Sequence, residues 1–417
     1  MAPIFSHKLH KVPSRYAGSI AATSRVFLLL CTFALVLIGL VMVYSSSSIK
    51  AINAGDSAST YVVKQLVWVG VGSALAFVLW KCVPLRVWRG PALWVAYGVA
   101  IVLLFACAVK GTYINGGKRW LSLFGSIGIQ PSEFAKVVFI LLAARIVTDL
   151  REGLMSGRAL IVQTALILIP LFLFIYRLES DLGSTLICVF AILAVMWLGE
   201  VNLRWILGIL AVGVVFVACA VFFSDYRSNR LVFLDPWNDG EGGYGKGYQI
   251  IRSYYAIADG GLFGVGLGNS HEKYLYLFSS ESDFIFSIIA EELGLVGACA
   301  VVALFIAFYC FGMRIARAST SQFGILVAAG FCVAIVFQAF VNIGSAVGIA
   351  PTTGKPLPFI SSGGSSMLAT FIMLGLILRV SSETQSDTIY RERRQNLRVV
   401  HSDKSIAREN MAREARR

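Results

Sequence analysis

The stretch VFLLLCTFALVLIGLVMVY, residues 26–44, decides the fold class, because this apolar run is long enough to cross a bilayer as a helix. The whole chain of 417 residues has a similar character: 57% of its residues are hydrophobic and only 14% are charged, whereas a soluble domain carries about 25% charged residues. Basic residues precede the run, as they do in a secretory signal, but no clear small-residue cleavage site follows it. We therefore predict an all-α, polytopic membrane protein that retains this run as its first span.

Ten runs meet the requirement of about 20 mainly apolar residues. They lie near residues 26–45, 61–80, 91–109, 131–148, 159–176, 182–198, 203–223, 284–312, 323–350 and 360–380. Lys and Arg are more frequent in the N-terminal segment and in every second loop after it, as expected of cytoplasmic segments. We predict cytoplasmic termini, with an N-terminal segment 1–25, a ten-helix membrane domain 26–380 and a basic tail 381–417.

The loop 224–282 is much longer than the others, and this topology places it outside. Its glycines and aromatic residues, as in DPWNDGEGGYGKGYQ (235–249), favour a folded outer cap over a disordered segment. The tail after Arg379 has alternating charges and is expected to be either helical or disordered.

The net charge of +13 does not require a nucleic-acid partner. Ten of the 36 Lys and Arg residues lie in the segment 379–417, and others flank apolar runs. Basic residues beside a membrane set its topology or bind anionic lipid. No nucleic-acid motif is present, and no spacing of Cys and His is typical of a metal site.

The stretch SSESDFIFSIIAEELG (279–294) places carboxylates at the start of a predicted span and inside it. Such residues are costly near lipid and usually face a cavity or a partner. Asp283 is either a functional carboxylate or the N-cap of the helix. Glu291 and Glu292 project about 100° apart on a helix, so we expect one of them to form hydrogen bonds within the bundle.

Two nearby motifs carry further charge. In QPSEFAK (130–136), Glu133 and Lys136 share a helix face and can pair, either to fix the bundle or to contact a substrate. In GGKRW (116–120), Lys118 and Arg119 suit an anionic headgroup or belong to a solvated loop.

Two segments suggest irregular backbone. The glycines of DGGLFGVGLGNS (259–270) would let backbone N–H groups approach a phosphate, but the spacing and context of a dinucleotide site or a P-loop are absent, so turns and close packing are the favoured explanation. PTTGKPLPFISSGGSS (351–366) enters the last span, and irregular backbone at membrane depth must be buried in protein or line a cavity. Asp181 either borders this cavity or caps its helix, and Gln338 and Asn342 are expected to form interhelical hydrogen bonds.

In this order, the motifs resemble those of the SEDS family, the FtsW/RodA/SpoVE group of peptidoglycan glycosyltransferases. The similarity extends over residues 26–379, and GLVMVYSSS (39–47) and GGKRW are more similar to FtsW, the division branch, than to RodA. The resemblance implies a ten-helix enzyme in the cytoplasmic membrane, at the septum for the division branch. This enzyme polymerises lipid II with a class B penicillin-binding protein as transpeptidase and with divisome proteins as further partners.

The family motifs also imply roles for single residues. Asp283 matches the essential aspartate, Glu133 and Lys136 match the charged pair, and Arg119 matches the loop arginine. The chain departs from the common family pattern at Glu281, where many members have His, and at Lys355, where an apolar residue is common.

The family reaction inverts configuration, which one direct displacement explains. We expect Asp283 to deprotonate the 4-hydroxyl of the acceptor GlcNAc. Several cations, together with a divalent ion such as Mg or Mn, would stabilise the departing diphosphate. The candidate substrate-binding residues are Lys118, Arg119, Glu133, Lys136, Asp181, Arg252, Lys355 and Ser362.

Two other classes of function compete with this hypothesis. A lipid flippase or transporter also has many spans and buried charges, although transporters commonly show interrupted helices in both halves, whereas the polar motifs here gather on one side. A non-enzymatic division scaffold would tolerate the loss of Asp283.

Overall fold

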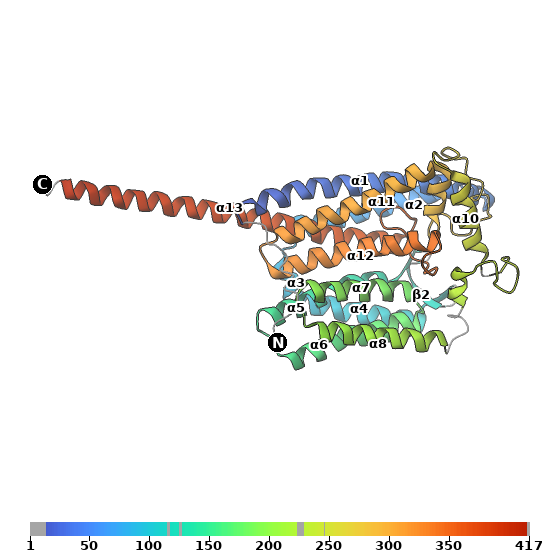
Figure 1. Cartoon of the computed structure of the whole chain (residues 1–417), viewed down its shortest axis with the longest axis horizontal. Coiled ribbons are helices and arrows are strands. Elements are labelled where there is room, and N and C mark those ends of the chain that lie inside the picture. Colours follow the sequence, from blue (N-terminus) through green and yellow to red (C-terminus); the bar gives the residue numbers. More distant parts are fainter. Residues whose placement is uncertain (1–13, 115–116, 125–126, 223–228, 246, 415–417) are drawn as a thin grey trace.

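The computed structural model describes residues 14–114, 117–124, 127–222, 229–245 and 247–414. Most of these residues form helices that run roughly parallel to one another (Figure 1). The helices are α1 (Ser14–Asn53), α2 (Thr60–Lys81), α3 (Leu85–Arg89), α4 (Pro91–Lys110), α5 (Pro131–Arg151), α6 (Gly157–Pro170), η1 (Leu171–Leu178), α7 (Leu182–Leu198), α8 (Leu203–Phe222), η2 (Asn229–Leu234), α10 (Tyr248–Gly260), α11 (Ile285–Ala318), α12 (Gln322–Ala346) and α13 (Gly364–Glu414).

The predicted all-α, polytopic class is confirmed. Within the described residues, six helical segments are long and apolar enough to cross a membrane: Tyr16–Asn53, Thr60–Lys81, Pro91–Lys110, Ile285–Ala318, Gln322–Ala346 and Gly364–Tyr390. Two shorter apolar helices are Val162–Leu178 and Leu182–Leu198. The ten predicted spans coincide with helical segments, but ten crossings, the cytoplasmic termini and the three predicted domains stay predictions.

Side-chain packing and close backbone approach hold the bundle together. Phe190 of α7 stacks on Phe337 of α12 at 3.9 Å between ring centroids. At Gly375 of α13, an added Cβ would lie 2.7 Å from the carbonyl oxygen of Ala76 in α2. Small residues permit such close contact between membrane helices, and α5 and α12 lie in the buried core.

A short antiparallel sheet, which the sequence analysis missed, lies between α4 and α5. Its strands are β1 (Thr112–Ile114), β2 (Gly117–Phe124) and β3 (Ile127–Ile129), in the order β1-β2-β3. The sheet lies at the same end of the bundle as α10 (Figure 1). It therefore holds residues 117–120 of the GGKRW motif on a strand and not in a free loop.

The long predicted loop 224–282 contains ordered structure in its described part, including α10. Asp239 organises the glycine-rich turn before α10, because its carboxylate accepts hydrogen bonds of 2.9–3.0 Å from four backbone N–H groups, those of Glu241, Gly243, Gly245 and Gly247. These bonds lower the pKa of Asp239 to about 2. Residues 224–228 and 246 of the predicted cap lie outside the described residues.

The loop that follows α10 docks against a break in α11. Gly294 has φ 69°, so it is not helical, and the backbone groups released there bond to residues 261–266. Val265 N donates to Glu291 O at 3.0 Å, and Leu295 N donates to Gly261 O at 2.9 Å. Two further bonds of this kind join Gly266 N to Glu292 O and Val296 N to Leu262 O. Turns and close packing therefore explain these glycines, as predicted.

Candidate active site

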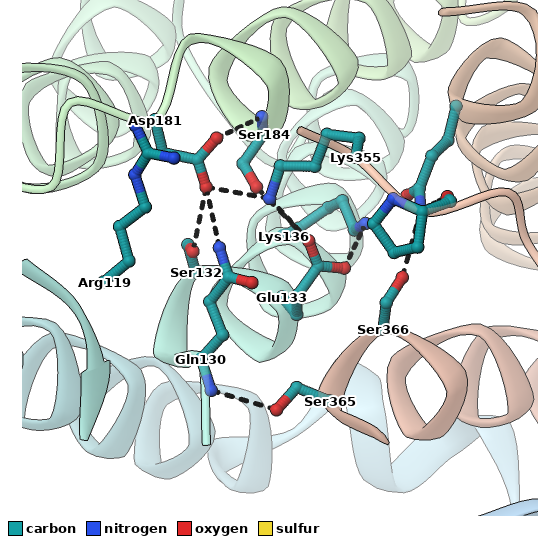
Figure 2. Close-up of polar contacts among 12 residues, drawn as sticks. Arg119, Gln130, Ser132, Glu133, Lys136, Asp181, Ser184, Lys355, Ser365 and Ser366 are labelled. Atoms are coloured by element: carbon teal, nitrogen blue, oxygen red, sulfur yellow. Dashed lines mark hydrogen bonds and ion pairs between the residues drawn. The ribbon is translucent and has the colours of Figure 1, made fainter. Parts of the chain in front are cut away.

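A buried cluster of four charged side chains lies between α5, the start of α7 and the segment before α13. Lys355 Nζ lies 2.8 Å from Glu133 Oε1 and 2.8 Å from Asp181 Oδ2. Lys136 Nζ lies 2.8 Å from Glu133 Oε2. Figure 2 shows the four side chains converging, and each is at most 2% exposed. The predicted pairing of Glu133 with Lys136 is confirmed, and we call these four residues the ion cluster.

Neutral polar groups complete the ion cluster. Gln130 Nε2 donates to Asp181 Oδ2 at 2.9 Å, and Lys136 Nζ donates to Gln338 Oε1 at 2.7 Å. Asp181 is also the N-cap of α7, because Ser184 N donates to Asp181 Oδ1 at 3.0 Å. The capping alternative for Asp181 is therefore confirmed, and it coexists with an ion pair. With two acids and two lysines, the ion cluster is electrically neutral.

The charges of the ion cluster stabilise one another. Burial alone would raise the pKa of Asp181, but the positive charges of Lys355 and Arg119 hold this pKa below its ordinary value. Burial would lower the pKa of Lys355, but Asp181 and Glu133 raise it above its ordinary value. Both side chains therefore stay charged near neutral pH.

Arg119 and Lys118 lie on β2 and differ in their contacts. The guanidinium of Arg119 donates to the carbonyl oxygens of Glu179 at 3.0 Å and Ser180 at 2.9 Å, so it braces the turn that presents Asp181. Figure 2 shows Arg119 beside Asp181. Lys118 Nζ donates to Val109 O at 3.3 Å and is half-buried.

Arg252 of α10 lies apart from the ion cluster. Its guanidinium is 3.4 Å from Glu272 Oε1 and lies over the rings of Tyr248, Tyr255 and Tyr276, at 4.8–5.9 Å from their centroids. These contacts hold α10 against the segment that follows it.

Asp283 lies in the turn before α11, and its carboxylate differs from those of the ion cluster. It forms no ion pair with the residues that the structure describes, and it is half-buried. Phe284 occupies the N-cap position of α11 without a side-chain capping bond, so the capping alternative for Asp283 was wrong. Burial raises the pKa of Asp283 to about 6, Glu281 adds to this shift, and Lys355 and Arg119 oppose it.

The neighbours of Asp283 along the chain are engaged in structural contacts. Glu281 forms an ion pair with Lys50 of α1, and its carbonyl oxygen accepts a hydrogen bond from Ser362 N at 2.9 Å. This bond is a main-chain contact of Ser362, and it ties the turn before α11 to the segment before α13.

One of Glu291 and Glu292 was expected to form hydrogen bonds, and in the structure both acids do so. Glu291 accepts a hydrogen bond from Ser270 Oγ at 2.6 Å, and Glu292 accepts one from Ser45 Oγ at 2.5 Å. Glu292 also pairs with Lys273 at 3.3 Å. Both acids therefore anchor residues 270–273 to α11.

The structure therefore brings Glu133, Lys136, Asp181 and Lys355 together with Arg119 beside them, and it leaves Lys118, Arg252 and Ser362 outside the ion cluster. Gln130, Ser132 and Ser184 also bind these acids, and none of the three was predicted to do so. Asn342 was predicted to be an ordinary interhelical amide, although Asn342 Nδ2 donates to the carbonyl oxygens of Asp283 at 2.9 Å and Lys355 at 2.8 Å. The sequence contained one signal for this role: Asn342 lies four residues after Gln338, so the two amides share a face of α12.

Several membrane-spanning helices around a charge-paired polar site, with an unpaired carboxylate at the same end as α10, define a polytopic membrane protein with a candidate active site. The chain belongs to the FtsW/RodA/SpoVE family of cell cycle proteins, whose model matches residues 25–386.

Relatives support this membership over most of the chain. Stage V sporulation protein E of Bacillus subtilis (strain 168) is 34% identical over 85% of this chain and 96% of its own length. The probable peptidoglycan glycosyltransferase FtsW of Nitrosococcus halophilus (strain Nc4) is 35% identical over 88% of this chain and 94% of its own length.

Solved structures share the fold. The rod shape determining protein RodA of Thermus thermophilus matches with a TM-score of 0.62 and 27% identity, over 86% of this chain and 96% of RodA. A chain from a study of "structural coordination of polymerization and crosslinking by a peptidoglycan synthase complex" matches with a TM-score of 0.66 and 28% identity, over 86% of this chain and 97% of that one.

Proposed function

We propose that this chain is a peptidoglycan glycosyltransferase that polymerises lipid II at the outer face of the cytoplasmic membrane, with Asp283 as the general base. Membership of the family and relatives named peptidoglycan glycosyltransferase support the reaction class. The observation that carries the role of Asp283 is the contrast between its unpaired, half-buried carboxylate and the four neutralised charges of the ion cluster.

The reaction requires one proton acceptor. The 4-hydroxyl oxygen of the acceptor sugar attacks the anomeric carbon of the donor, the bond from that carbon to the diphosphate breaks, and the diphosphate leaves with the bonding electrons. The hydroxyl proton passes to Asp283. A pKa of about 6 leaves most of this carboxylate ionised at neutral pH but still basic enough to accept a proton.

The leaving diphosphate needs positive charge more than a proton. Lys118 is half-buried on β2, and within the described part of the chain its Nζ has one hydrogen bond, to a carbonyl oxygen at 3.3 Å, so we assign it the role of meeting the diphosphate. Lys355 and Lys136 are neutralised by acids, so in this proposal they shape the site and the substrate does not displace them.

A divalent cation such as Mg or Mn is a separate proposal. Among the described residues, no group of three His, Cys, Asp or Glu side chains could hold a metal ion. In this proposal, phosphate oxygens of the substrate would supply ligands to the cation, and no step of the reaction above depends on it.

The same relatives support a proposal for the cellular setting. We propose a class B penicillin-binding protein as transpeptidase partner and a division role at the septum with divisome proteins. Relatives named FtsW and a neighbour from a peptidoglycan synthase complex support this setting. Depletion of the chain should then give filaments with normal width, and a fluorescent fusion should locate to the septum.

The test of the reaction is glycan-strand formation from lipid II by the purified protein with its cognate transpeptidase. Asp283→Asn is compared with the wild type and with Asp259→Asn, the same substitution at an exposed aspartate of α10. We expect polymer from the wild type and from Asp259→Asn, and a loss of at least about 100-fold in Asp283→Asn, in line with the removal of a general base.

Other outcomes separate the competing functions. Equal polymer from Asp283→Asn would remove Asp283 as the base. Transport of labelled lipid II across vesicles without polymer would favour the flippase, and neither activity, with partner binding intact, would favour a scaffold.

A further inference from the structure

The turn that carries Asp283 is held at three consecutive carbonyl oxygens, those of residues 281–283. They accept hydrogen bonds from Ser362 N at 2.9 Å, Ser361 Oγ at 2.6 Å and Asn342 Nδ2 at 2.9 Å, in that order. Two of the three donors come from the segment before α13, and the third is a side chain of α12. The carboxylate of Asp283 therefore projects from a backbone that is fixed on one side.

The side chain of Asn342 also donates a second hydrogen bond, to a residue outside the turn of Asp283. Its Nδ2 also donates to the carbonyl oxygen of Lys355 at 2.8 Å, and Lys355 Nζ pairs with Glu133 and Asp181. Both contacts of Nδ2 are with carbonyl oxygens, which only accept hydrogen bonds, so the orientation of the amide is fixed by chemistry. One amide group thus links the backbone of Asp283 to the backbone of the ion cluster.

We propose that Asn342 is a positioning residue, which holds the carboxylate of Asp283 at a fixed place relative to the ion cluster through these two hydrogen bonds. The inference rests on the proposed function, because it assumes that Asp283 is the base. A displacement of about 1 Å can reduce a rate about 100-fold even when it arises away from the reacting atoms. Asn342 would therefore affect turnover without touching the substrate.

Asn342 combines two donated hydrogen bonds with one buried acceptor that has no partner, so its net contribution to stability is small. The side chain is 1% exposed, and among the described residues its Oδ1 has no hydrogen-bond partner. An unpaired buried acceptor offsets part of the stabilisation that the two donated bonds provide. Leucine, which has a similar size, removes the unpaired acceptor, but it also leaves the carbonyl oxygens of Asp283 and Lys355 without this donor, so Asn342→Leu should unfold at a somewhat lower temperature than the wild type.

Gln65 of α2 provides a matched control. It is also a buried amide, 2% exposed, whose Nε2 donates to the carbonyl oxygen of Ser361 at 3.0 Å and whose Oε1 has no partner among the described residues. Its hydrogen bonds within the described residues go to Ile360 and Ser361 of the segment before α13 and not to the turn of Asp283. Gln65→Leu therefore imposes the same chemical change without removing the bridge.

The experiment measures lipid II polymerisation, its pH profile and thermal unfolding for Asn342→Leu, Gln65→Leu and Asp283→Asn. We expect Asn342→Leu to lower kcat by about 10- to 100-fold with little change in KM. The acid limb of its pH profile should move to lower pH, because a loosened turn exposes Asp283 to water and burial is what raises its pKa. Gln65→Leu should change neither kcat nor the acid limb.

Each remaining outcome decides the matter. Wild-type kcat in Asn342→Leu, or an equal loss in Gln65→Leu, would overturn the positioning role while an inactive Asp283→Asn leaves the proposed function intact. An active Asp283→Asn would overturn the proposed function itself. If Asn342→Leu does not fold, Asn342→Ser retains one donor and should lower kcat with the same shift of the acid limb; an unshifted limb with normal kcat would refute the proposal.

Discussion

The ion cluster and the turn of Asp283 lie close together but differ in the ion pairing of their carboxylates. In the ion cluster, both acids contact a lysine at 2.8 Å, and the site is neutral. In the turn, Asp283 has no ion-pair partner in the described structure, and only its backbone is held. Paired buried charges fix a structure, whereas an unpaired carboxylate on a fixed backbone is available for chemistry. Substitutions can therefore test whether the two regions have separate roles.

The largest effect is expected from unbalancing the ion cluster. Glu133→Gln leaves two lysines with one acid, and breaking a buried pair costs about 3–5 kcal/mol because a charge loses its partner. The variant should show a much lower apparent melting temperature and less folded protein on size exclusion in detergent.

The double variant Glu133→Gln/Lys136→Met is the control, because it leaves Asp181 paired with Lys355 and restores neutrality. It should be more stable than Glu133→Gln alone. A single variant as stable as the wild type would mean that the ion cluster does not stabilise the bundle.

A smaller effect is expected from the charge beside Asp283. A general base must be ionised, so activity should fall as pH decreases through about 6, the pKa of Asp283, which burial raises first and Glu281 second. Glu281→Gln removes a negative neighbour and leaves Lys50 unpaired, so it should move the acid limb of kcat/KM to lower pH.

Glu281→Gln/Lys50→Met removes both charges of this pair and should move the acid limb less than the single variant. An acid limb that stays in place in Glu281→Gln would show that Glu281 does not influence the group that titrates.

The smallest effect concerns Glu179, which precedes Asp181 and does not belong to either region. Burial, and then the charge of Asp181, raise the pKa of Glu179 to about 8. Between its ordinary pKa and pH 8 the folded state therefore holds a proton that the unfolded state has lost, so stability decreases as pH rises through this window.

Glu179→Gln removes this proton. Its apparent melting temperature should exceed that of the wild type by a few degrees at pH 8 to 9 and match it at pH 5. Parallel melting curves across this range would show that Glu179 titrates in the ordinary way.

Local periodicity predicted the parts of the molecule that depend on neighbouring residues. Apolar runs located the helices, and the spacing of Glu133 and Lys136 predicted their pairing, because residues three apart share a helix face. The placement of Lys355 on Glu133 and Asp181 depends on how three distant segments pack, which no local pattern contains.

The errors have physical causes as well. The strands of residues 112–129 are short and interrupted by glycines, so their alternation gave little signal. The helical period separated Glu291 and Glu292 by about 100°, but it could not predict that residues 270–273 would contact both of them. The loop 261–266, which precedes this segment, docks against the break in α11.

That break makes α11 and the loop 261–266 one cooperative unit. The amide protons of Val265 and Gly266 point to α11 carbonyls, and those of Leu295 and Val296 point to loop carbonyls. If Gly294 had helical dihedral angles, the loop would lose the space that it occupies, because the backbone of Gly264 lies against Gly294. If the loop leaves while α11 keeps its bend, four backbone groups of the helix lose their partners. Conversely, α11 cannot straighten while the loop is in place. Local opening then releases these four amide protons for exchange with solvent together, as one group.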